Sequence, residues 1–205
     1  MAVASVTQAG IVGRHHEEPD QLYVETRELR VQGFLLFMVS DLVLFSSFIF
    51  AYLYLRNTGQ GWPPPGAPKL DLALASINSV ILFGSGATMH FALENWKHRN
   101  FTKFANWIIA TIILGAMFLS GQIVEYAKIS ATWGGSGIFG AGFFTLTGMH
   151  GFHVFCGIIY LTVLLLQALQ GKYTFQKYTG LTLGTLYWHF VDVIWVVLFS
   201  IFYLY

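Results

Sequence analysis

Long apolar stretches separated by short polar connections dominate the chain. Five of them are long enough to cross a bilayer core of about 30 Å at 1.5 Å per residue of helix. They run over residues 31–55, 70–93, 104–124, 138–169 and 180–204. The runs are continuous and do not alternate between polar and apolar positions, which excludes the strands of a β-barrel. The pattern predicts an all-α, polytopic membrane helix bundle of five transmembrane helices within residues 31–205.

Residues 1–30 are polar and predict a cytoplasmic N-terminal tail without a cleaved signal peptide. Eight Lys and Arg residues flank one side of the predicted spans and three flank the other. The richer side holds Arg14, Arg27, Arg30, Lys97, Arg99, Lys103, Lys172 and Lys177, and the poorer side holds Arg56, Lys69 and Lys128. Because positive charge accumulates on the cytoplasmic side, we expect a cytoplasmic N-terminus and an external C-terminus.

Composition supports a membrane protein. The chain is 55% hydrophobic and only 10% charged, whereas a soluble domain carries about 25% charged residues. A net charge of +1 gives no indication of nucleic-acid binding. The single cysteine, Cys156, allows neither an intrachain disulfide nor a thiolate-rich metal cluster.

Asp41 is an acid inside the first apolar run, next to Ser40. Ionisable groups at membrane depth are expensive and normally have a partner or a function. Two interpretations are open for Asp41. It is either a buried acid satisfied by neighbouring hydroxyl groups, or a functional carboxylate at a proton or lipid site.

Histidines and acids mark the last two runs. His150 and His153 are three residues apart, as are His189 and Asp192, so each pair shares a helix face. One interpretation is a haem or copper site in which His189 and Asp192 add ligands. The other is a hydrogen-bonded cluster that holds the fourth and fifth helices together, which we prefer because the apolar neighbours offer little to orient metal ligands. Glu125, on one face with Gln122, is expected to anchor the third helix.

Two stretches carry a family resemblance, Thr147–Val154 (TGMHGFHV) and Tyr187–Trp195 (YWHFVDVIW). Together they resemble the histidine motifs of subunit III of haem–copper terminal oxidases. Gln122–Tyr126 (QIVEY) and Trp62–Gly66 (WPPPG) fit the same family. The resemblance covers the chain from about residue 31 to its end. Long members have seven helices, so five imply the short bacterial form without the first two.

The resemblance implies a helical bundle with a V-shaped cleft filled with phospholipid. Family members hold no redox centre, dock on the catalytic subunit, stabilise it during turnover and support proton uptake. The family's lipid-cleft carboxylate maps to Asp41, where an aspartate replaces the usual glutamate. His150, His153, His189, Asp192 and Glu125 are then an interhelix polar cluster, with no catalytic residue and no metal ligand in this chain.

These features favour an accessory subunit of an aerobic cytochrome c oxidase in the bacterial inner membrane. The expected partners are the catalytic subunit I and the copper-bearing subunit II, which would hold the haems and copper, together with phospholipid, and cytochrome c at the level of the complex. One cysteine and clustered histidines fit neither of those two subunits. The alternatives are subunit III of a quinol oxidase and a homologue associated with nitric oxide reductase. A transporter or channel would need a polar path, which the isolated polar clusters do not provide.

Overall fold

The computed structural model describes residues 19–58, 70–133, 137–171 and 178–204. Within these ranges it describes the side chains from Arg27 onward, except those of residues 132–133. These residues form α1 (Pro19–Thr58), α2 (Leu72–Lys97), α3 (Phe101–Trp133), α4 (Gly137–Leu169) and α5 (Thr179–Phe199), and a π-helical turn, η1 (Ser200–Leu204), continues α5. Each of the five α-helices includes a stretch long and apolar enough to cross a membrane. The predicted all-helical fold with five spans is therefore confirmed.

α1 and α3 extend furthest beyond their predicted spans. α1 begins at Pro19, inside the segment expected to be a polar tail, and α3 continues to Trp133. Hydropathy detects only the part of a helix that suits hydrocarbon, whereas Glu, Gln, Arg and Leu prolong a helix equally well in water. Arg14, Lys69, Lys172, Lys177 and the Trp62–Gly66 segment lie outside the described residues.

The helix ends follow from local chemistry. Asp71 caps α2, since its side chain accepts a hydrogen bond of 3.1 Å from the Leu74 backbone N–H. α2 and α3 are joined by a three-residue connection in which Arg99 takes a positive φ of 58°. α4 ends where Gly171 adopts a positive φ of 69°, a conformation that suits glycine. The short connection after α2 makes α2 and α3 antiparallel neighbours.

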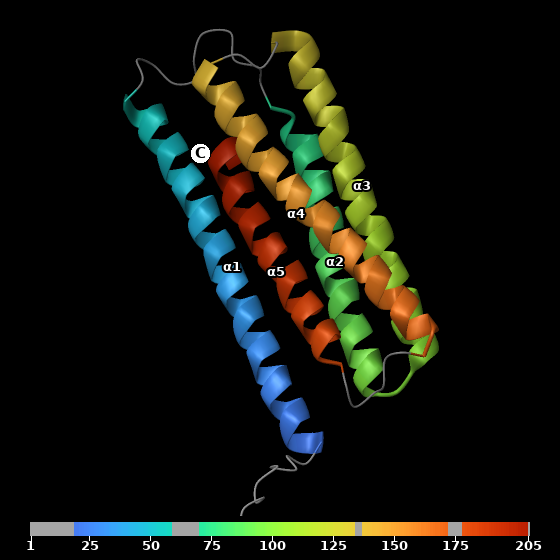
Figure 1. Cartoon of the computed structure of the whole chain (residues 1–205). Coiled ribbons are helices and arrows are strands. Elements are labelled where there is room, and N and C mark those ends of the chain that lie inside the picture. Colours follow the sequence, from blue (N-terminus) through green and yellow to red (C-terminus); the bar gives the residue numbers. More distant parts are fainter. Residues whose placement is uncertain (1–18, 59–69, 134–136, 172–177, 205) are drawn as a thin grey trace, which may run out of the picture.

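The helices form one bundle in which α1 lies at an edge (Figure 1). α2 packs mainly on α3, α4 packs on α3 and α5, and α5 also packs on α2. α1 contacts α4 and α5 along one side. Only 11% of the most apolar stretch of α1 is buried inside the bundle, whereas 44% of the corresponding stretch of α5 is buried. The last helix is therefore central, and the first exposes most of its surface to whatever surrounds the bundle.

Trp188 occupies the middle of the bundle. Its indole N–H donates a 3.0 Å hydrogen bond to Ser85 Oγ of α2. Its ring lies between α3 and α4, so close that a Cβ on Gly115 or Gly157 would come within 2.9 Å of it. These glycines make room for the ring, as small residues do in tightly packed membrane helices. One side chain of α5 thus contacts three other helices.

Candidate functional site

A buried acid and a histidine meet where α1 crosses α4. Asp41 Oδ2 lies 3.4 Å from His153 Nε2, and both side chains are almost fully buried. His153 Nδ1 is 2.7 Å from the carbonyl oxygen of Met149. A carbonyl oxygen can only accept, so Nδ1 carries hydrogen and Nε2 faces the carboxyl group.

α5 completes the surroundings of this pair. The Tyr187 hydroxyl donates a 3.1 Å hydrogen bond to the backbone carbonyl of His153. The Phe45 ring of α1 lies 5.1 Å from the imidazole, centre to centre. The pair is therefore enclosed by three helices. Asp41 and His153 are the sequence-predicted residues that the structure brings together across two helices.

An apolar pocket of about 210 Å³ opens beside the pair, between α1 on one side and α4 and α5 on the other. Its walls are Phe34, Phe37, Cys156, Tyr160, Gly184 and Tyr187. Phe37 lies one helical turn before Asp41, and Cys156 one turn after His153. The pocket therefore lies about one helical turn from the Asp41–His153 pair along both α1 and α4.

A second hollow lies further toward the start of α1. It has a volume of about 450 Å³ and lies between α1 and the first turns of α5. Arg27, Tyr178, Thr179 and Thr182 give it polar groups, and aliphatic side chains of both helices form the rest. Going along α1, the surroundings thus change from a cationic, hydroxylated hollow to an apolar pocket and then to a buried acid.

His150 has quite different surroundings from His153, although both belong to α4. The imidazole of His150 is fully buried and stacks on Trp195 at 5.0 Å, with the edge of Phe118 at 5.7 Å. Among the described residues, neither ring nitrogen has a hydrogen-bond partner. His150 therefore packs as an aromatic ring between α3, α4 and α5.

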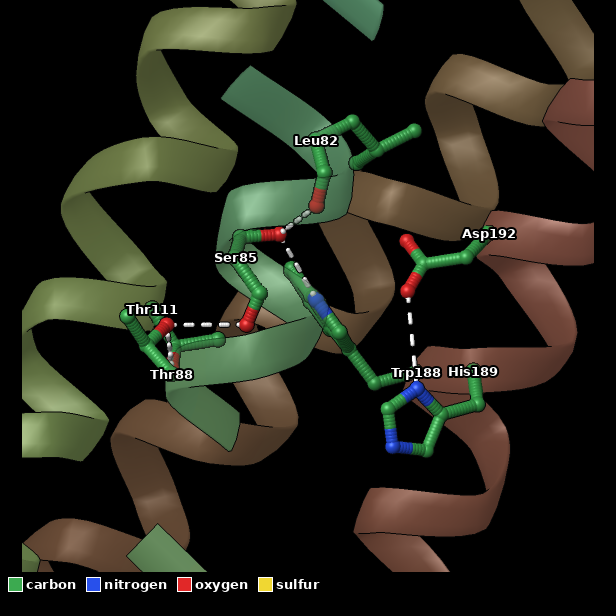
Figure 2. A network of polar contacts seen from close by, with 7 residues as sticks. All are labelled: Leu82, Ser85, Thr88, Thr111, Trp188, His189 and Asp192. Atoms are coloured by element: carbon green, nitrogen blue, oxygen red, sulfur yellow. Dashed lines mark hydrogen bonds and ion pairs between the residues drawn. The ribbon is translucent and has the colours of Figure 1, made fainter. Parts of the chain in front are cut away.

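His189 and Asp192 lie on the other side of α5, toward α2. His189 Nδ1 is 3.6 Å from Asp192 Oδ2. Figure 2 shows the pair beside the hydrogen bond from Trp188 to Ser85. A Cβ on Gly86 of α2 would collide with the Asp192 carboxylate. The pair thus belongs to the contact between α2 and α5, whereas the sequence analysis placed it between α4 and α5.

Side chains near Glu125 form hydrogen bonds between α3 and α4. Gln122 Nε2 donates to the carbonyl oxygen of Thr147 at 3.0 Å, and the hydroxyls of Tyr126 and Thr147 are 2.6 Å apart. Glu125 itself is buried next to the Tyr203 hydroxyl of η1. The anchoring contacts to α4 come from its neighbours in the predicted QIVEY segment.

The predicted single cluster is thus divided into separate contacts. His153 pairs with Asp41, His150 packs on aromatic rings, and His189 and Asp192 pair beside α2. Within the described part of the chain, no group of three or more His, Cys, Asp or Glu side chains is arranged to hold a metal ion.

Two tryptophan–serine hydrogen bonds between α5 and α2 were not predicted from the sequence. Trp195 donates a 2.8 Å hydrogen bond to Ser79 Oγ, and Trp188 donates one to Ser85 Oγ. The signal was present as two tryptophans seven residues apart on one helix and two serines six residues apart on another. Nothing in a single sequence indicates that these two helix faces meet.

The chain is similar in sequence to known proteins over almost its whole length. A sequence model of the family described as "Cytochrome c oxidase subunit III" matches residues 6–205. The chain is 35% identical to a cytochrome c oxidase subunit 3 of Thermostichus vulcanus, with 98% of this chain and 96% of the relative aligned. It is 34% identical to that of Bacillus subtilis, with 91% and 90% aligned. The chain, a polytopic membrane subunit of a haem–copper oxidase complex, belongs to the cytochrome c oxidase subunit III family.

Proposed function

We propose that the chain is the non-redox accessory subunit of a bacterial, proton-pumping cytochrome c oxidase of the inner membrane. The haems and copper lie in partner subunits I and II. This chain stabilises the catalytic subunit, holds phospholipid and supports proton uptake. The observation that carries the proposal is the buried Asp41–His153 pair, which lies one helical turn from an apolar pocket.

The shape and polarity along α1 suit a phospholipid. Arg27 offers a cation for a phosphate group, and Tyr178 and Thr182 offer hydroxyls beside it. The apolar pocket at Phe34 and Tyr187 then accepts an acyl chain. From Arg27 to Phe37 the helix rises by about 15 Å, which is half of the hydrocarbon thickness. The V-shaped cleft expected from the family resemblance stays a prediction.

The Asp41–His153 pair supports a role in proton uptake. The pair places a carboxyl group 3.4 Å from an imidazole at a site enclosed by three helices, one helical turn from an apolar pocket. Such a pair within the membrane is able to exchange protons with a neighbouring pathway without opening a water-filled channel through this chain. In this proposal the pathway itself belongs to the catalytic subunit.

Cytochrome c is the proposed electron donor, in keeping with the names of the bacterial relatives. The quinol-oxidase alternative rests on Asp41, because an aspartate at this position resembles quinol-oxidase members of the family. The two proposals differ in the partner subunit, since only a cytochrome c oxidase carries a copper centre in subunit II.

Purification through an affinity tag on this chain tests the proposal. We expect haem and copper absorption bands in the purified material, oxygen consumption with reduced cytochrome c, and phospholipid that remains after detergent washing. Oxygen consumption with a quinol but not with cytochrome c would select the alternative. A colourless preparation of this chain alone, active in solute transport, would contradict both.

A further inference from the structure

A histidine faces outward from the middle of the last helix. The side chain of His189 is 43% exposed, although it lies near the centre of the span Thr179–Leu204. It shares one face of α5 with the exposed aliphatic side chains of Val193 and Val196. At 1.5 Å per residue, His189 lies about 15 Å from the start of α5. That depth corresponds to the middle of a hydrocarbon core about 30 Å thick, and an imidazole is too short to extend from there to the interface.

The orientation of the His189 ring is fixed from inside the chain. Its Nδ1 faces Asp192 (Figure 2). The carboxylate of Asp192 is itself buried against Gly86 of α2. Within the part of the chain that the structure describes, Asp192 is the only hydrogen-bonding or ion-pairing partner of His189. The second ring nitrogen, Nε2, lies on the opposite side of the ring and is not among the fully buried unpaired atoms. One polar nitrogen is therefore presented to the outside.

Hydrocarbon does not suit this surface. A polar group without a hydrogen-bond partner is expensive in an apolar medium, and ionisable side chains in membrane helices rarely face lipid. The outward face of α1 offers a contrast, because Leu36, Val43 and Phe50 make it apolar. Lipid suits the face of α1, whereas the face at His189 requires a protein that brings a hydrogen-bonding group.

We propose that the outer face where α2 meets α5 docks on a transmembrane helix of another oxidase subunit, and that this helix carries a polar side chain that hydrogen-bonds His189 Nε2. The face consists of Val80 and Phe83 of α2 with His189, Val193 and Val196 of α5. Four of these five side chains are apolar, so packing surrounds one central polar contact. The proposal rests on membership of the chain in the oxidase complex.

Retention of the chain on the complex tests the histidine. The oxidase is purified through a tag on a haem-bearing subunit and washed with increasing detergent. We expect His189→Leu to lower retention about tenfold, equivalent to about 1.4 kcal/mol. His189→Gln, which keeps a hydrogen-bonding group, should restore most of it. His98→Leu is the matched control, because His98 is highly exposed beyond the end of α2, and it should behave as the wild type.

Photo-cross-linking tests the face without removing the histidine. A benzophenone amino acid at Val193 should cross-link to a membrane polypeptide, and the same probe at Val43 of α1 should cross-link to lipid. Unchanged retention of His189→Leu, equal loss in His189→Gln, or lipid cross-links at Val193 would overturn the docking proposal. If the wild-type chain fails to copurify with haem, the proposed function itself fails, and the two outcomes are thereby distinguished.

Discussion

At the scale of single residues, tryptophan–serine hydrogen bonds join the central helix to its neighbour. Trp188 and Trp195 of α5 donate to Ser85 and Ser79 of α2, and all four side chains are buried. An indole has one donor and no acceptor, so each N–H depends on its serine. In a bilayer the hydrophobic effect does not hold helices together, and such bonds between helices contribute alongside close packing.

Removing the serine hydroxyl that accepts the indole hydrogen bond should lower the stability of the protein. We expect Ser85→Ala to lower stability by about 1 kcal/mol, within the range of interhelical hydrogen bonds in membranes, because the Trp188 N–H loses its partner. The thermal midpoint of the purified protein in detergent measures the loss. Ser120→Ala is the control, since Ser120 is exposed and its hydroxyl bonds only to Ala116 of its own helix. Equal midpoints for the two variants would contradict the prediction.

The role in proton uptake that we propose for Asp41 is tested by removing its carboxyl group. We expect Asp41→Ala to leave the complex assembled but to shorten its catalytic lifetime or slow proton uptake, because His153 loses its partner. Time courses of oxygen consumption and of proton uptake measure both effects. Asp41→Glu retains the carboxyl group and should stay close to wild type. The prediction is wrong if turnover number and inactivation rate are both unchanged in Asp41→Ala.

At the scale of helices, α2 and α5 approach closely because Gly86 lacks a side chain. The carboxylate of Asp192 occupies the space where a Cβ would lie. We expect Gly86→Ala to separate the two helices and lower both the thermal midpoint and the yield in membranes. Gly84→Ala is a matched control two residues away, since a Cβ there meets nothing within 4 Å. Similar behaviour of the two variants would refute this account.

The first turn of α2 should respond to pH through its cap. The hydrogen bond from the Leu74 N–H is the main cause that lowers the pKa of Asp71, and Lys128 adds to it at 3.5 Å. A lowered pKa means that the charged carboxylate stabilises the folded state. This contribution is present above the unfolded pKa of about 3.9 and is lost as the pH falls through the lower folded pKa.

Asp71→Ala should therefore lower the thermal midpoint at pH 7, and the difference from wild type should shrink below about pH 4. Asp71→Asn keeps an acceptor for Leu74 without a charge, so its midpoint should lack this pH dependence. Melting curves in detergent from pH 7 down to about pH 3 measure both variants. A difference between Asp71→Ala and wild type that stays constant across that range would exclude the carboxylate as its cause.

At the scale of the whole molecule, the five spans of the described residues place the start of α1 and the end of η1 at opposite ends of the bundle. Arg27, Arg30, Lys97, Arg99 and Lys103 lie near one end, and Arg56 and Lys128 near the other. Alkaline phosphatase fused after Leu204 should be active and a fluorescent protein fused there should be dark. The reverse result would overturn the proposed orientation, and fusions in the α2–α3 connection provide the internal control.

The sequence predicts the spans well and the contacts between them poorly. Each span is a local property of about 20 apolar residues, so hydropathy alone is enough to count five helices. The Asp41–His153 pair joins residues far apart in sequence, and no local pattern indicates which face of α1 meets α4. The same holds for His189 and Asp192, whose spacing predicts the contact within α5 but not the approach of Gly86 from α2.

The central position of Trp188 also constrains how the protein is made. α5 follows α1, α2, α3 and α4 in the chain, so these helices are synthesised before the ring that fills the space beside Gly115 and Gly157. Until then Ser79 and Ser85 lack their donors. Nascent chains that stop before residue 179 therefore contain an unfilled centre, and membrane proteases should remove them faster than the finished protein.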